Sequence, residues 1–119
     1  MRSGEINKDG ASETRILHWI LAQLRNRYPA PAIWERQGAA MMTNPNGDNF
    51  KVGTKGQADI RGLYRGRYFE LEVKKPGEDQ RPSQVKREKM INGAGGTYAV
   101  VRNPTEAFAV VDRVMNDAR

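Results

Sequence analysis

The apolar residues that follow Ser12 recur three or four positions apart, as they do along one face of an α-helix. They are Ile16, Leu17, Ile20, Leu21 and Leu24. Ser12 is a suitable N-cap residue, and Pro29 cannot continue a helix, so the pattern predicts a helix from residue 12 to about residue 28. Residues 1–11 carry no such period and are rich in Gly, Asn, Asp and Ser, which predicts a flexible leader.

Short apolar and aromatic runs predict three strands after this helix. They cover residues 32–37, 58–64 and 67–74. The last two are separated only by Arg65-Gly66, which predicts a hairpin with a two-residue turn. Residues 38–56 are the least regular part of the chain, and their Asn46-Gly47 turn signal leaves two possibilities open, a hairpin tip or an ordered loop.

The C-terminal part of the chain predicts a helix, a strand and a second helix. The first helix is expected from about residue 82 to residue 92, and the glycines after it supply its exit. Residues 97–102 are β-branched and apolar, as in a strand buried on both faces. Asn103 can cap the last helix, with Glu106 three residues later as in a capping box. This order of elements predicts one α/β domain over residues 12–119.

Alternation along residues 67–74 assigns their side chains to two faces of a sheet. Phe69, Leu71 and Val73 form the face toward the core, and Tyr68, Glu70, Glu72 and Lys74 form the other. A two-residue turn pairs Tyr64 with Arg67 and therefore places Asp59 directly opposite Glu72. Their Cβ atoms are then roughly 4.5–5.5 Å apart.

Two carboxylates directly opposite each other destabilise a sheet unless a positive charge lies between them. Lys74, on the same face as Glu72, is one such charge, and a divalent cation held by Asp59 and Glu72 is the other. A three-residue turn would shift the pairing by one and weaken this argument. The alternative is a solvent-exposed face on which Glu and Lys side chains pair with one another. The chain has no cysteine and one histidine, so a metal site must use oxygen ligands and suit a hard cation.

The net charge of +6 and the sequence pI of about 9.9 favour a polyanionic partner such as a nucleic acid. Basic residues gather around the predicted hairpin and the helix after it: Lys51, Lys55, Arg61, Arg65, Arg67, Lys75, Arg81, Lys86, Arg87 and Lys89. Such side chains contact phosphates without reading sequence, although several of them will be ordinary solvated charges. No apolar run approaches the roughly 20 residues that cross a bilayer. The polar N-terminus has no signal core, so a cytoplasmic protein without membrane contact is expected.

The candidate residues occur in a spaced set of motifs. The motifs are GQADI with Gly56 and Asp59, ELEVKKPG with Glu72, Val73 and Lys74, and SQVKREKMINGAGGTYAVVRN with Gln84. In this set the chain resembles the virus-type replication-repair nuclease domain (VRR-NUC), a branch of the PD-(D/E)xK nuclease superfamily. The resemblance covers residues 12 to 112 and implies a restriction-endonuclease-like αβββαβ core, here with a C-terminal helix. The chain departs from the superfamily motif at Ala58, where a proline is usual.

The resemblance also implies a metal site. Asp59 and Glu72 would bind Mg²⁺ or Mn²⁺, together with the carbonyl of Val73 and the carboxylate of Glu13. The ordinary alternative for Glu13 is a first-turn glutamate that suits the helix dipole. Glu70 lies on the same face as Glu72, so the residues leave open which glutamate is the ligand, and the spacing to the lysine favours Glu72.

Lys74 and Gln84 complete the set of catalytic residues that the resemblance implies. Lys74 would orient the attacking water or stabilise charge on the phosphate, and Gln84 would face the site from the second predicted helix. The ordinary alternative for Gln84 is an exposed helix glutamine.

The activity implied by the resemblance is metal-dependent, structure-selective endonucleolytic cleavage of DNA. Small members of the family resemble Holliday-junction resolvases, so a homodimer that resolves four-way junctions in DNA repair is expected, and the size fits a phage protein. Three other functions remain open: a nicking or flap endonuclease without junction preference, a restriction-type endonuclease, and a catalytically silent nucleic-acid-binding module.

Overall fold

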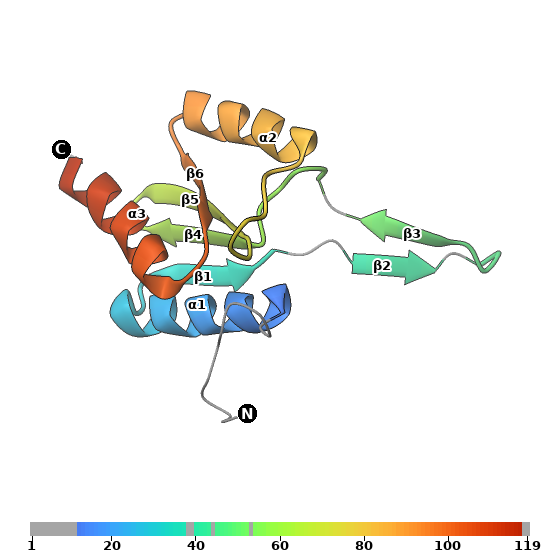
Figure 1. The fold of residues 1–119 in the computed structure, drawn as a ribbon, viewed down its shortest axis with the longest axis horizontal. Helices are drawn as coiled ribbons and strands as arrows, with labels where there is room; N and C mark the ends of the chain where they lie inside the picture. The colour runs from blue at the N-terminus through green and yellow to red at the C-terminus, as the bar shows by residue number, and fades with distance from the viewer. Residues whose placement is uncertain (1–11, 38–39, 44, 53, 118–119) are drawn as a thin grey trace.

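The computed structural model describes residues 12–37, 40–43, 45–52 and 54–117, and the predicted leader, residues 1–11, lies outside this part of the chain. Figure 1 shows the elements in their order: α1 (Glu13–Arg27), β1 (Ile33–Arg36), β2 (Ala40–Thr43), β3 (Asn49–Val52), β4 (Ile60–Tyr64), β5 (Arg67–Val73), α2 (Pro82–Gly93), β6 (Thr97–Val101) and α3 (Pro104–Asp117). The predicted fold class, mixed α/β with a C-terminal helix, is confirmed.

Two sheets make up the strand content of the described residues. The larger has four strands in the order β1-β4-β5-β6, in which β1, β4 and β5 are antiparallel and β6 runs parallel to β5. The smaller is the antiparallel hairpin of β2 and β3, which is inserted between β1 and β4 and projects from one end of the larger sheet (Figure 1). Within the irregular segment 38–56, residues 40–43 and 49–52 therefore form a hairpin, which is one of the two possibilities left open by the sequence. Without it, the order of elements is αβββαβ followed by α3, as expected.

The β4–β5 hairpin has the register that its turn predicts. Tyr64 pairs with Arg67 across a two-residue turn, and Arg65-Gly66 takes φ values of 49° and 82°. Positive φ at both turn residues is the requirement of a type I′ turn, whose twist matches that of the strands. Asp59, one residue before β4, consequently lies opposite Glu72.

Helices α1 and α3 pack on one face of the four-stranded sheet, and apolar side chains fill the space between them. The buried residues of α1 are those predicted from the helical spacing: Ile16, Leu17, Ile20, Leu21 and Leu24. β5 contributes Phe69, Leu71 and Val73, none of which is exposed. The core-facing side chains assigned by alternation are therefore confirmed.

Helix α2 lies over the opposite face of the sheet, so the charged face of β5 is covered (Figure 1). Glu70, Glu72 and Lys74 are only 0%, 3% and 5% exposed. This finding contradicts the alternative of a solvent-exposed Glu–Lys face. Among the residues of α2, all of which are described, only Gln84 is buried, so the helix has no broad apolar face against the sheet.

The expectation that β6 is buried on both faces is confirmed in part, because Tyr98 and Val101, three residues apart, are buried on opposite faces while its other residues are half-buried. β6 is an edge strand of the sheet, and only its residues Tyr98 and Val101 are buried. A run of β-branched and aromatic residues indicates a strand that packs on a pleated surface, but it does not specify how many strands lie beside it.

Both predicted helix N-caps are present. Ser12 Oγ accepts a hydrogen bond from the Arg15 backbone N–H (3.1 Å), and Asn103 Oδ1 accepts one from that of Glu106 (2.8 Å). The Glu106 carboxylate reaches one residue further than in a standard capping box, because it accepts from the backbone N–H of Arg102 (2.9 Å).

Gly62 of β4 provides a test of the core packing. A Cβ atom at this position would overlap Cε3 of Trp34, a residue that is 3% exposed. Gly62→Ala is therefore expected to lower the free energy of unfolding in urea by about 1–3 kcal/mol, the usual cost of overpacking. Gly93→Ala is the matched control, because a Cβ at Gly93 meets no atom within 4 Å. An equal fall in the free energy of unfolding in both variants would contradict this packing.

Candidate metal centre

Asp59 is fixed at the point where the chain enters β4. Its Oδ2 accepts a hydrogen bond from the Val73 backbone N–H (2.8 Å), and its backbone carbonyl accepts one from Gln37 (2.6 Å). In an extended strand, the N–H and C=O of one residue point toward the same neighbouring strand. The Val73 carbonyl therefore points in the same direction as its N–H, toward the neighbouring segment that holds Asp59.

Glu72 is buried beside Asp59, and its two carboxylate oxygens have different surroundings. Oε2 accepts a hydrogen bond from Gln84 Nε2 (2.7 Å) and lies 3.6 Å from Lys74 Nζ. Oε1 is buried and has no hydrogen-bond partner among the described residues. A buried polar atom without a partner is costly, so Glu72 Oε1 is a site where a further ligand is expected.

Burial makes both carboxylates of this pair harder to ionise. The pKa of Glu72 is raised to about 7, first by burial and then by the negative charge of Asp59. Burial also raises the pKa of Asp59, against the hydrogen bond from Val73 and the positive charge of Lys74. A bound cation would reverse this effect, because it stabilises the charged form of both groups.

Glu13 lies at the margin of this pair, in the first turn of α1. Its pKa is raised to about 7, mainly by a hydrogen bond with the carboxyl group of Glu78, and the charges of Lys74 and Asp59 also act on it. Glu78 follows β5 in the loop before α2, and its Oε1 accepts a hydrogen bond from the Lys75 backbone N–H (2.7 Å). Sequence reasoning missed Glu78, whose only signal was its place just after the Lys-Pro-Gly segment.

Glu70 is bound in a separate network and is not available as a ligand. Its carboxylate accepts hydrogen bonds from Arg87 Nη2 (2.7 Å), the Tyr68 hydroxyl (2.6 Å) and the Ala58 backbone N–H (3.3 Å). Burial opposes its ionisation, but these three donors hold the pKa of Glu70 below its usual range. Of the two candidate glutamates, the geometry therefore favours Glu72.

The Asp59–Glu72 pair offers carboxylate oxygens, the type of ligand that a hard divalent cation takes. Within the described ranges, no group of three or more His, Cys, Asp or Glu side chains lies close enough together to hold a metal ion. Magnesium nevertheless needs few protein ligands, because it retains waters and takes substrate oxygens into its shell. Asp59, Glu72 Oε1 and the Val73 carbonyl would be the nearest donors, and Glu13 lies beside them.

The side chains predicted to contact phosphates fall into two groups. Arg61 and Arg87 are already ion-paired, with Glu35 (3.0 Å) and Glu70 (2.7 Å) respectively. The pair of Arg87 is largely buried and holds α2 on β5, so we assign Arg87 a structural role in place of the predicted phosphate contact. Lys55, Arg81 and Lys86 are exposed, and Lys75 is half-buried. Lys51 lies in β3, and its side chain is outside the described part of the chain.

Comparison with known proteins supports the fold. No family model matches the chain, and no curated protein matches its sequence. Seven chains of solved structures match it. One of these, described as a VRR_NUC domain, covers 84% of this chain and 94% of its own length, with a TM-score of 0.50 and 17% sequence identity. The resemblance to VRR-NUC is thus confirmed for the fold, and the protein is an α/β domain of this fold with a carboxylate pair in which Glu72 is buried and Asp59 half-buried.

None of the described helices is long and apolar enough to cross a membrane.

Glu72 is expected to make the metal-free protein less stable as the pH rises. Its pKa of about 7 in the folded chain exceeds the ordinary value of 4.5. The stabilisation by its protonated form is therefore complete below the ordinary pKa and is lost as the pH rises through the folded-state value. In EDTA, Glu72→Gln is expected to show a smaller fall in melting temperature than the native chain between about pH 5 and about pH 8.

The control for this experiment is Asp79→Asn, which removes an exposed carboxylate from the same loop region. Its melting temperature should follow that of the native chain across the pH range. Parallel curves for the native chain and Glu72→Gln would contradict the raised pKa of Glu72.

Proposed function

We propose that the chain is a nuclease that hydrolyses phosphodiester bonds in DNA with Mg²⁺ or Mn²⁺ held by Asp59 and Glu72. The observation that carries this proposal is the carboxylate pair of half-buried Asp59 and buried Glu72, in which Glu72 Oε1 has no partner among the described residues. Two like charges held close together away from water are costly unless a positive group compensates them. The VRR_NUC fold and the basic net charge support the same activity.

Each side chain of the site has a distinct role in the proposed reaction. When bound, the divalent ion supplies Lewis acidity and lowers the pKa of its water. Gln84 donates to Glu72 Oε2 and so orients the carboxylate with Oε1 left for the metal. Lys74 Nζ, 3.6 Å from the same carboxylate, places a positive charge where negative charge develops on the phosphate. Glu13 would join the ligand shell from the edge of the site.

We further propose that the substrate is branched DNA, such as a four-way junction, and that the active form is a homodimer. Exposed cations near the site would position phosphates without reading bases, which suits recognition of DNA shape. The β2–β3 hairpin leaves the sheet beside Asp59, where it extends the surface available to DNA (Figure 1). A two-fold symmetric dimer presents two equivalent sites to a two-fold symmetric junction.

Substitutions at the site are expected to separate the roles of these residues. Asp59→Asn and Glu72→Gln should abolish cleavage of a labelled four-way junction, and Lys74→Met should slow it by about 10²–10³-fold. Gln84→Ala acts through Glu72, so it should lower the Mg²⁺ affinity or the activity by about 10–100-fold, and added metal should partly restore the rate. Cleavage is measured with Mg²⁺, with Mn²⁺ and with EDTA, on the junction and on a matched linear duplex.

Asp79→Asn is again the control and should cut at the native rate. If both DNAs are cut, the proposed nuclease activity is supported and the proposed junction preference is wrong. If only a flap substrate is cut, the chain is a flap endonuclease. If no DNA is cut with any metal although the junction binds, the chain is a silent binding module and the proposed nuclease is wrong. Sedimentation of the native chain tests the homodimer.

A further inference from the structure

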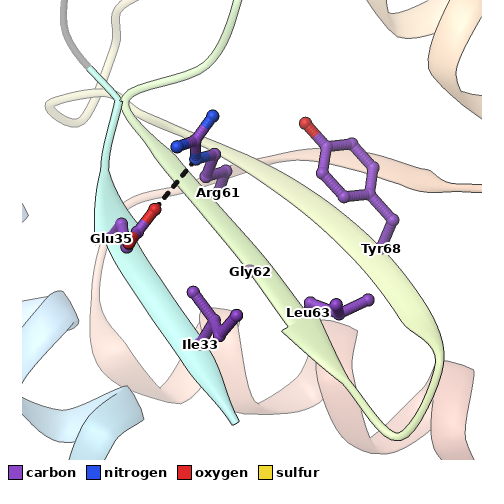
Figure 2. A pocket seen from close by; sticks show the side chains of 6 residues that line it. All are labelled: Ile33, Glu35, Arg61, Gly62, Leu63 and Tyr68. Atoms are coloured by element: carbon purple, nitrogen blue, oxygen red, sulfur yellow. Dashed lines mark hydrogen bonds and ion pairs between the residues drawn. The ribbon is translucent and has the colours of Figure 1, made fainter.

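A cavity of about 400 Å³ lies on the sheet face that carries Asp59 and Glu72. Its lining comes from β1, β4 and β5. Its lining residues are Ile33, Glu35, Arg61, Gly62, Leu63 and Tyr68 (Figure 2). The proposed nuclease reaction uses none of these side chains, except that Arg61 was among the predicted phosphate contacts.

The lining combines apolar surfaces with one charged pair. Ile33 and Leu63 are 48% and 44% exposed, so both present aliphatic surface at the cavity. Figure 2 shows the Arg61–Glu35 pair and the Tyr68 ring in the upper part of the view, with Ile33 and Leu63 below them. This combination suits a nucleobase, because its faces stack on apolar or aromatic groups and its edges form hydrogen bonds.

The Tyr68 ring is held in place in the unbound protein. Its hydroxyl donates to Glu70 Oε2 (2.6 Å), and Glu70 is itself fully buried and bound to Arg87. A preordered ring loses little conformational entropy on binding. Arg61 engages Glu35 through Nε alone, and a guanidinium carries further N–H donors beyond this one.

The cavity is also correctly placed relative to the metal site. Asp59, Arg61 and Leu63 alternate along the chain and therefore share one face of the sheet. Each step of two residues along a strand covers about 7 Å. A nucleotide that adjoins a phosphate held at Asp59 can thus reach the cavity.

We infer that this cavity binds one unpaired nucleobase of the nucleic-acid substrate, next to the phosphate that is cut. This inference rests on the proposed function and extends it to a subsite for single-stranded or distorted DNA. A second copy of the chain is a poorer occupant, because a stable interface buries roughly 800 Å² per partner and the cavity exposes two aliphatic side chains.

The test compares binding of two single strands of equal length and phosphate number, one with bases and one abasic. The full-length chain in EDTA is titrated into each fluorescent strand, and anisotropy reports the affinity. The native chain should bind the base-containing strand at least roughly fivefold more tightly, as stacking of one base predicts. Leu63→Ser should reduce the ratio of the two affinities toward one, while its affinity for the abasic strand stays that of the native chain. Met90→Ser, which alters an exposed side chain on α2, is the matched control and should keep the native ratio.

Ile33→Ser provides a second, independent variant and should behave as Leu63→Ser does. Equal binding of both strands by the native chain would overturn the subsite, even if metal-dependent cleavage is found. If Leu63→Ser and Ile33→Ser both keep the native ratio of the two affinities but self-associate more weakly in sedimentation, the cavity is instead a contact between copies of the chain. Absence of both binding and cleavage for every DNA would refute the proposed function itself.

Discussion

Polar contacts, and not an apolar seam, hold α2 on the sheet. Gln84 donates to Glu72 (2.7 Å), and Arg87 forms a two-pronged pair with Glu70, both across a buried boundary. Removing one partner of such a pair leaves an uncompensated buried charge, which typically costs about 3–5 kcal/mol. β5 therefore bears the apolar core on one face and both the helix anchor and the candidate metal site on the other. The position of α2 and the geometry of the site depend on the same strand.

The two buried glutamates of β5 have opposite electrostatic environments, although they are two residues apart on one face. Glu70 has three donors, and its pKa is held below the usual range. Glu72 keeps one oxygen without a described partner, and its pKa is raised to about 7 beside Asp59. Neighbouring carboxylates with diverging pKa values mark different roles, which here are an anchor for α2 and the proposed ligand for a cation.

Sequence patterns within a few residues predicted those features of the fold that depend on local backbone geometry, such as the register of a hairpin. The Arg65-Gly66 turn determines the register of the β4–β5 hairpin, and this register places Asp59 opposite Glu72, so the pairing could be predicted from the sequence alone. The burial of the charged face was not predictable, because alternation assigns side chains to faces but does not say which helix covers a polar face. α2 carries no apolar stripe that would have signalled its contact with the sheet. The approach of Glu78 to Glu13 depends on how a loop returns to α1, which no periodic pattern encodes.

The central claim is that Asp59 and Glu72 hold a divalent cation, and the most direct test is to locate that ion. Crystals of the native chain grown with Mn²⁺ would give an anomalous diffraction signal at the manganese position. The account predicts a peak in contact with the carboxylates of both residues, and no peak there in crystals of Asp59→Asn. A saturating Mn²⁺ concentration that leaves this position empty, or that places manganese only elsewhere on the chain, would contradict it.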